Sequence, residues 1–277
     1  MEEKNISING QNVNYKIAEE AEPLFDFGGI KIMSDQKKRC VSVLILHGWG
    51  GSSDSWCAVQ KILANNGYKV IVLDLPGFGK SVTPKIPWGI TEYSNFVLDF
   101  IREIKLENFC LLGHSFGGRV AIRFSKDHPE LVNKLVLCDA AGIKMKPDFK
   151  TMMILLVAKI GNGILSPKPL ARFRDSARSF FYSFIRHRDY VKADDTMKET
   201  LKKVLNEDLL LDIPKIQEET LIVWGAEDKM LPVKYARVFK KEIKNSRLEI
   251  LPGIGHGPHL EVPEKLSKII LDFLSNC

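Results

Sequence analysis

The chain has 277 residues, of which 45% are hydrophobic and 27% are charged, and its formal net charge is +6. This length and composition are typical of a globular domain with a sizeable core, and they exclude an intrinsically disordered chain. Lys and Arg residues are spread along the sequence rather than gathered in one tract, so we expect no nucleic-acid partner.

The sequence contains no apolar run of about 20 residues, the length needed to span a bilayer. The nearest candidate, residues 152–165, is shorter and contains Lys159. The N-terminal residues lack the pattern of a secretory signal, which predicts a cytoplasmic location. The five cysteines are odd in number and are not placed at metal-ligand spacing, so we expect free, buried thiols.

The predicted elements begin with a hairpin and continue as alternating strands and helices. Residues 6–17 alternate around Asn9-Gly10, which is typical of a β-hairpin turn, and a loop with one strand at 29–33 follows. Continuous apolar runs predict strands over residues 41–46, 69–73, 109–112, 134–137, 221–224 and 247–251. Helical spacing predicts helices over residues 55–66, 91–105, 117–128, 233–243 and 263–274. This order predicts an α/β fold with a mostly parallel central sheet flanked by helices.

The alternation stops between residues 142 and 213, where helical segments follow one another without a convincing strand. We interpret 142–213 as a helical cap inserted between the core segments 1–141 and 214–277. One cap helix is strongly amphipathic, with apolar residues at Leu170, Phe173, Ala177, Phe180, Phe181 and Phe184. Its apolar face favours a lid over a pocket; a membrane-surface or partner-binding helix is the alternative.

The sequence Gly113-His114-Ser115-Phe116-Gly117 follows one predicted strand and opens a helix. This is the G-x-S-x-G pattern in the strand-turn-helix context that it requires. Glycine leaves room for the tight turn, which raises the Ser115 hydroxyl above the sheet, so Ser115 is the predicted nucleophile.

Two further residues follow strands later in the chain, in the order Ser, Asp, His. Asp228 comes after the strand at 221–224, and His256 lies in a glycine-rich loop after the strand at 247–251. Asp139 also follows a strand and is the alternative acid. Glu227 is adjacent to Asp228, but neighbouring positions in a turn point in different directions.

These motifs, together with His47-Gly48-Trp49-Gly50-Gly51 and the turn at residues 74–81, resemble the α/β-hydrolase family in its capped branch, with lipase-like and esterase-like members. The resemblance covers the chain from about residue 41 to the C-terminus, apart from a weakly matched cap. It implies a Ser115-His256-Asp228 triad and an oxyanion hole formed by the backbone N–H groups of Trp49 and Phe116.

The remaining histidines and glycines have simpler interpretations. His114 is a candidate for contact with substrate, as are Phe180, Phe181 and Phe184 in the cap, although a histidine beside the nucleophile more often packs under the turn. His47 is interpreted as structural. His259 lacks acidic or cysteine partners at ligand spacing, and no nucleotide-binding glycine motif is present, so we predict neither a metal nor a cofactor.

The predicted function is a serine hydrolase that cleaves a carboxylic ester or similar acyl bond of a small molecule. Carbon-carbon hydrolysis of ring-fission-type products is the alternative, because the Gly-Trp-Gly-Gly and Ser-Phe-Gly-Gly segments also resemble those relatives; His114 replaces the asparagine that many of them carry. A ligand-binding receptor on a hydrolase scaffold is the alternative of a different class. No sequence feature indicates an oligomeric state.

Overall fold

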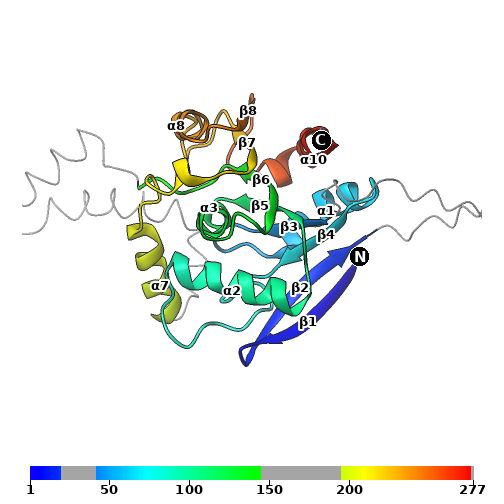
Figure 1. The fold of residues 1–277 in the computed structure, drawn as a ribbon, viewed down its shortest axis with the longest axis vertical. Coiled ribbons are helices and arrows are strands. Elements are labelled where there is room, and N and C mark those ends of the chain that lie inside the picture. The colour runs from blue at the N-terminus through cyan, green and yellow to red at the C-terminus, as the bar shows by residue number, and fades with distance from the viewer. Residues whose placement is uncertain (20–41, 145–194, 276–277) are drawn as a thin grey trace, which may run out of the picture.

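The computed structural model describes residues 1–19, 42–144 and 195–275, which form an eight-stranded sheet of order β1-β2-β4-β3-β5-β6-β7-β8 (Figure 1). The strands are β1 (Glu2–Ile8), β2 (Gln11–Ala18), β3 (Ser42–Leu46), β4 (Lys69–Leu73), β5 (Phe109–His114), β6 (Val132–Cys138), β7 (Glu219–Gly225) and β8 (Ser246–Leu251). Strands β1 and β2 pair antiparallel, as do β2 and β4, and every other pair is parallel. The predicted mostly parallel sheet is confirmed.

The predicted N-terminal hairpin is formed by β1 and β2, which pair up to Ile8 and Gln11. Both turn residues have positive φ, 50° at Asn9 and 77° at Gly10, as the two-residue turn that suits the twist of a hairpin requires. Strand β2 then adds to the edge of β4, so the hairpin extends the sheet.

Helices cover both faces of the sheet. They are η2 (Ser53–Trp56), α1 (Cys57–Ala64), α2 (Ile90–Glu103), α3 (Phe116–Asp127), α7 (Asp195–Asn206), η3 (Ile213–Lys215), α8 (Lys234–Glu242), α9 (Pro258–Glu261) and α10 (Pro263–Ser275). The five predicted core helices correspond to α1, α2, α3, α8 and α10. The short η2, η3 and α9 were not predicted, because three or four residues carry no helical periodicity.

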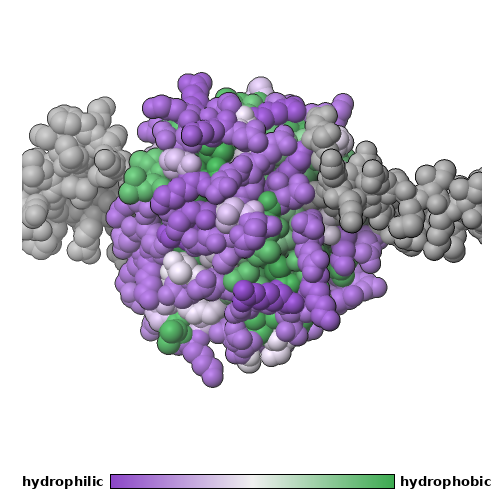
Figure 2. Space-filling model, in the orientation of Figure 1, coloured by the Kyte–Doolittle hydropathy of each residue, from purple (hydrophilic) through white to green (hydrophobic). Residues whose placement is uncertain are grey.

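Successive side chains of each buried strand point to opposite faces of the sheet, where they join two separate hydrophobic cores. In β3, Leu44 and Leu46 join one core with residues of α2, α3 and α8, while Val43 and Ile45 join the other with residues of α1 and α10. Figure 1 shows these two helix groups on opposite sides of the sheet. Hydrophilic residues cover most of the face drawn in Figure 2, as expected for helices with one buried side.

Helix α7 lies within the range predicted as a cap and is bonded to the core. Thr200 accepts a hydrogen bond from Trp88 N–H at 3.0 Å, and the Glu207 carboxylate accepts one from Ile90 N–H at 2.8 Å. Buried Arg119 of α3 donates to the Glu207 carbonyl at 2.9 Å. Residues 145–194, which contain the predicted amphipathic helix, lie outside the described residues, as does the predicted strand at 29–33, so the cap boundaries stay a prediction.

The cysteines differ in part from the prediction. Cys57 and Cys138 are free, whereas Cys110 is disulfide-bonded, so the expectation of a free thiol is wrong for that residue. Spacing along the chain does not show which thiols the fold brings within bonding distance. Cys40 and Cys277 lie outside the described residues. Across the described ranges, every helix is too short or too polar to cross a bilayer.

The end of β3 and the start of α3 approach each other closely at Gly117. The Gly117 N–H donates to the His47 carbonyl at 3.1 Å, and a Cβ on Gly117 would lie 2.2 Å from the Leu46 carbonyl oxygen. Real Cβ atoms do not approach backbone oxygen so closely. This contact is therefore possible only with glycine.

We expect Gly117→Ala to lower the free energy of unfolding by about 1–3 kcal/mol, because backbone would have to move to admit the methyl group. Gly257→Ala is the matched control, since its nearest neighbour would be a Glu261 oxygen at an ordinary 3.7 Å. Chemical denaturation of both variants measures the difference. Equal losses of stability in the two would contradict the steric argument.

Candidate active site

Ser115 occupies the turn between β5 and α3, with φ 51° and ψ −113°. A non-glycine residue with positive φ is strained and persists only where its surroundings hold it. Here the Ser115 N–H donates to the Cys138 carbonyl at 3.3 Å, and its carbonyl accepts from Gly118 N–H at 3.0 Å. A Cβ on Gly113 would lie 2.5 Å from the Gly117 carbonyl oxygen. The flanking glycines thus permit the turn that carries the serine.

The structure brings the three residues of the predicted triad together. His256 Nε2 lies 2.9 Å from Ser115 Oγ, and His256 Nδ1 lies 2.6 Å from Asp228 Oδ2. An ionised carboxylate can only accept, so the Nδ1 proton donates to Asp228, and Nε2 is left to accept the serine hydroxyl proton. The arrangement is that of a nucleophile bonded to a base that a buried acid orients.

Asp228 is itself held in place by the loop after β7. Its Oδ1 accepts hydrogen bonds from Met230 N–H at 2.8 Å and Leu231 N–H at 2.9 Å. The side chain is buried, whereas neighbouring Glu227 is exposed. The turn therefore aims only the second of the two adjacent acids at His256.

The backbone around His256 is fixed at three points. The Glu261 carboxylate accepts from Gly255 N–H at 3.0 Å and from Gly257 N–H at 3.2 Å. His114 Nε2 donates to the His256 carbonyl at 2.8 Å, and the His114 side chain is buried. This geometry matches the packing interpretation of His114. Glu261 was missed from the sequence, because nothing local marks its contact with both amides.

The two predicted oxyanion-hole residues also meet near Ser115. The rings of Trp49 and Phe116 lie edge to face with centroids 5.2 Å apart, and Phe78 packs 4.8 Å from Trp49. The Phe116 N–H is at the start of α3, where helix backbone donors lack intrahelical acceptors. Among the described residues, neither the Trp49 nor the Phe116 N–H has a hydrogen-bond acceptor. Both N–H groups are therefore free to donate to a further acceptor, as the predicted oxyanion hole requires.

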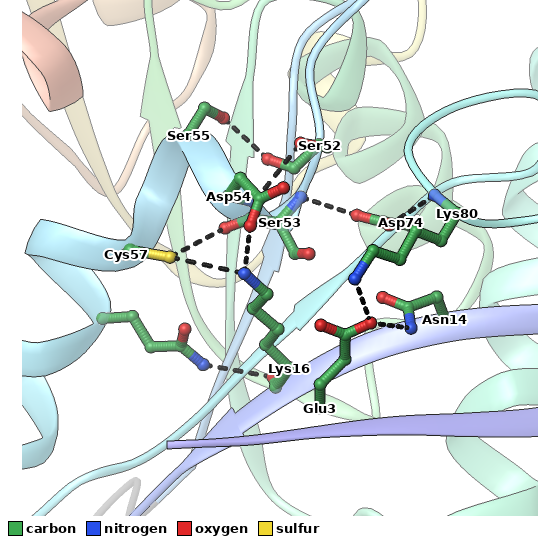
Figure 3. A network of polar contacts seen from close by, with 11 residues as sticks. Glu3, Asn14, Lys16, Ser52, Ser53, Asp54, Ser55, Cys57, Asp74 and Lys80 are labelled. Atoms are coloured by element: carbon green, nitrogen blue, oxygen red, sulfur yellow. Dashed lines mark hydrogen bonds and ion pairs between the residues drawn. The ribbon is translucent and has the colours of Figure 1, made fainter.

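The loop that carries Trp49 is tied to the turn after β4. Asp74 accepts from Ser53 N–H at 2.6 Å through one oxygen and from Lys80 N–H at 2.9 Å through the other, as Figure 3 shows. Buried His47 accepts from Leu75 N–H at 3.1 Å through Nε2 and bonds the Gly48 carbonyl at 2.8 Å through Nδ1. Both ring nitrogens of His47 are engaged, in agreement with a structural role.

Three buried histidines surround this site. Burial lowers the pKa of His47, His114 and His259, and it lowers the pKa of His259 to about 3, with smaller contributions from His256 and His47. His259 stacks on Trp56 at 4.3 Å with the rings nearly parallel. These three imidazoles are therefore neutral at neutral pH.

The described residues contain one group of side chains whose potential ligand atoms lie close enough to hold a metal ion. Asp139, Asp228 and His256 place these atoms within 4.8 Å of one another, and His259 is not part of the group. Asp228 and His256 already bond to each other, and His256 bonds to Ser115. A metal there would compete with the bonds that join the serine to its base.

The remaining predicted contacts with substrate lie elsewhere in the chain. Phe180, Phe181 and Phe184 fall outside the described residues. Their place near Ser115 stays a prediction.

The neutral histidines predict a loss of stability in acid. An unfolded histidine has a pKa of about 6.5, so below this pH the unfolded chain takes up a proton that folded His259 does not. The free energy of unfolding of the wild type should therefore fall relative to His259→Phe by about 1.4 kcal/mol per pH unit as the pH drops below about 6.5. Phenylalanine keeps a ring against Trp56 but cannot be protonated. Denaturation curves across this pH range test the prediction, and a constant difference between the two proteins would refute it.

Comparison with known proteins shows the family of the chain. Residues 41–263 match the family model described as alpha/beta hydrolase fold, which confirms the resemblance drawn from the motifs.

Monoacylglycerol lipase abhd6-A of Xenopus laevis is 29% identical over 257 residues, covering 85% of this chain and 75% of the relative. The 2-hydroxy-6-oxo-6-(2'-aminophenyl)hexa-2,4-dienoic acid hydrolase of Metapseudomonas resinovorans is 28% identical over 264 residues, covering 90% and 89%. The solved structure of a serine hydrolase involved in carbazole degradation has a TM-score of 0.70 at 27% identity and covers 99% of this chain and 98% of its own. The match spans the sheet from β3 to β8 and all three residues that meet at Ser115, and the chain belongs to the α/β-hydrolase fold family.

Proposed function

We propose that this chain is a serine hydrolase that cleaves a carboxylic ester or a similar acyl bond of a small molecule through an acyl-enzyme intermediate. The observation that carries the proposal is the continuous hydrogen-bonded chain from Ser115 through His256 to Asp228. A receptor that only binds its ligand would have no need for this chain. The three residues take the roles of nucleophile, general base and orienting acid.

In the first half of the reaction, Ser115 Oγ attacks the acyl carbon while its proton passes to His256 Nε2. Asp228 stabilises the imidazolium through Nδ1–H. The oxyanion that forms accepts hydrogen bonds from the backbone N–H groups of Trp49 and Phe116, each worth about 3–4 kcal/mol to the transition state. The bond to the leaving group then breaks, and the leaving oxygen takes the proton from Nε2.

In the second half, water attacks the acyl carbon of the acyl-enzyme while His256 Nε2 takes a proton from that water. The second tetrahedral intermediate collapses, Ser115 regains its proton from His256, and the acid leaves. The same residues act in both halves, so the reaction needs no metal or cofactor.

The proposal extends to a cap, most of which lies outside the described residues. We assign residues 142–213 to a helical cap, with Phe180, Phe181 and Phe184 in contact with an apolar acyl group. The bonds that tie residues 200 and 207 to the core support a cap attached beside α2 and α3. A cytoplasmic location remains part of the proposal.

Carbon-carbon hydrolysis is the second candidate, and the similarity to the Metapseudomonas resinovorans hydrolase supports it. The proposed ester reaction draws support from the lipase relative. Many carbon-carbon hydrolases carry asparagine at the position of His114, so His114 favours ester hydrolysis over carbon-carbon hydrolysis. The two reactions share the triad but differ in the bond that breaks.

Turnover of p-nitrophenyl esters from acetate to long acyl chains tests the proposal. We expect sustained hydrolysis by the wild type and a loss of at least about 10⁴-fold in kcat for Ser115→Ala, because the nucleophile is removed. Hydrolysis that survives this substitution would contradict the proposed mechanism. If the folded wild type cleaves a vinylogous diketone but no ester, the carbon-carbon reaction is the correct one.

The bonds from Glu261 predict an effect on rate without direct contact with substrate. We expect Glu261→Ala to lower kcat by about tenfold to hundredfold with little change in KM, because the backbone on both sides of His256 loses its anchor. Glu264→Ala is the matched control, since it removes an exposed acid nearby in the first turn of α10. Steady-state kinetics of the two variants provide the measurement, and equal kcat values would contradict a positioning role for Glu261.

A further inference from the structure

A second buried carboxyl lies beside the proposed triad. Asp139 follows β6, has φ 40° and is fully buried. Its N–H donates to the Val223 carbonyl at 2.9 Å, and its Oδ1 accepts from Gly225 N–H at 2.9 Å. Both bonds lead to β7, the strand that precedes Asp228. The strained backbone of Asp139 is thus hydrogen-bonded to β7, the same strand that positions Asp228.

The two carboxyls are close to each other and to the base. One oxygen of Asp139, one oxygen of Asp228 and a ring nitrogen of His256 all lie within 4.8 Å of one another. Two carboxylates that share a buried site cannot both remain ionised, because each charge disfavours the other. One of the two must therefore hold a proton.

The hydrogen-bond donors decide which one. Asp228 receives two backbone N–H groups and the Nδ1 proton of His256, all of which favour its charged form. Asp139 receives one backbone N–H, and the Cys138 thiol lies 3.8 Å from its Oδ2. The proton therefore belongs on Asp139.

The electrostatic surroundings point the same way. Burial raises the pKa of Asp139 well above its ordinary value, and the charge of Asp228 and a hydrogen bond with it raise the pKa further. The Gly225 N–H and the Cys138 thiol oppose this shift without cancelling it. Burial also raises the pKa of the Cys138 thiol, so this neighbour is neutral.

We propose that Asp139 is a positioning residue for the proposed triad, a neutral carboxylic acid that shares its proton with Asp228, so that the pair carries one proton and one negative charge. The inference rests on the proposed function, because it concerns the acid that orients His256. The shared proton fixes the direction in which Asp228 presents its charge. When Asp228 is neutralised, Asp139 can ionise and supply the missing charge beside His256.

Asp139→Asn and Asp228→Asn, made singly and together, test this proposal. The first readout is kcat/KM for a p-nitrophenyl ester between about pH 5 and 9, where the acidic limb reports the base. The second is the rate at which a fluorophosphonate labels Ser115, which needs the triad but not a matching acyl group.

In the wild-type background, we expect Asp139→Asn to change both rates by less than about threefold and to leave the acidic limb in place. Asparagine keeps an oxygen for the Gly225 N–H and offers an N–H to Asp228, as the protonated acid does. If Asp139 is instead ionised, its removal takes a negative charge away from His256. The acidic limb would then move to lower pH, which overturns the proposal.

In the Asp228→Asn background, we expect Asp139→Asn to lower both rates by at least about tenfold, because the remaining source of negative charge is lost. Equal rates for the single Asp228→Asn variant and the double variant would overturn the proposal. A residue that only braces the backbone through Gly225 would give equal rates, since asparagine preserves that bond.

An infrared measurement covers the case in which Asp139→Asn does not fold. The wild type labelled with ¹³C-aspartate should show the carbonyl stretch of a protonated carboxylic acid at neutral pH, and absence of that band overturns the proposal. Failure of the proposed function is distinguishable: a wild type that neither hydrolyses esters nor reacts with the fluorophosphonate refutes the function. A reactive wild type with equal single and double variants refutes this inference alone.

Discussion

The strained turn at Ser115 is the constraint on which the rest of the site depends. A serine with φ 51° persists at the end of β5 only where neighbouring backbone holds it, and the ends of β6 and β3 together with the start of α3 supply that support. Cys138 at the end of β6 accepts its N–H, His47 after β3 accepts from Gly117, and α3 starts directly behind it. Because glycine at position 117 lets these segments approach closely, the turn that carries Ser115 is hydrogen-bonded directly to the start of the loop that carries Trp49.

The second feature is the separation of charge around His256. Three neighbouring histidines are held neutral by burial, and the carboxyls nearest to the base are Asp228, which receives several donors, and Asp139, which receives few. With its three histidine neighbours neutral, His256 has few competing charges around it, which suits the proton transfer that we propose between Ser115 and a leaving group.

Membership of the α/β-hydrolase fold family does not identify the substrate of this chain. The relatives include a monoacylglycerol lipase and a hydrolase of a dienoic acid, and the chain is similar to both at nearly the same identity. The family match includes Ser115, Asp228 and His256, but a shared fold and a shared set of residues do not choose between the two kinds of substrate. After the undescribed residues 145–194 the chain continues with helix α7, and the bonds of Thr200 and Glu207 join this part of the chain to the core beside α2.

The sequence by itself determined the elements and the residue types at their ends. Apolar runs, helical spacing and the glycines around Ser115 are local patterns, and such patterns indicate strands, helices and turns without knowledge of long-range contacts. Since parallel strands share one carboxyl edge, the order Ser115, Asp228, His256 was enough to predict a common site.

Only the tertiary structure decided contacts between residues that no local pattern connects. Glu261 joins the two amides beside His256, His114 supports the carbonyl of the base from 142 positions earlier in the chain, and Cys110 is in a disulfide. Asp139 was visible as an alternative acid, but its proximity to Asp228 arises from the pairing of β6 with β7. Such distances depend on how strands align and how loops close over them, and these are properties of the folded chain rather than of any segment.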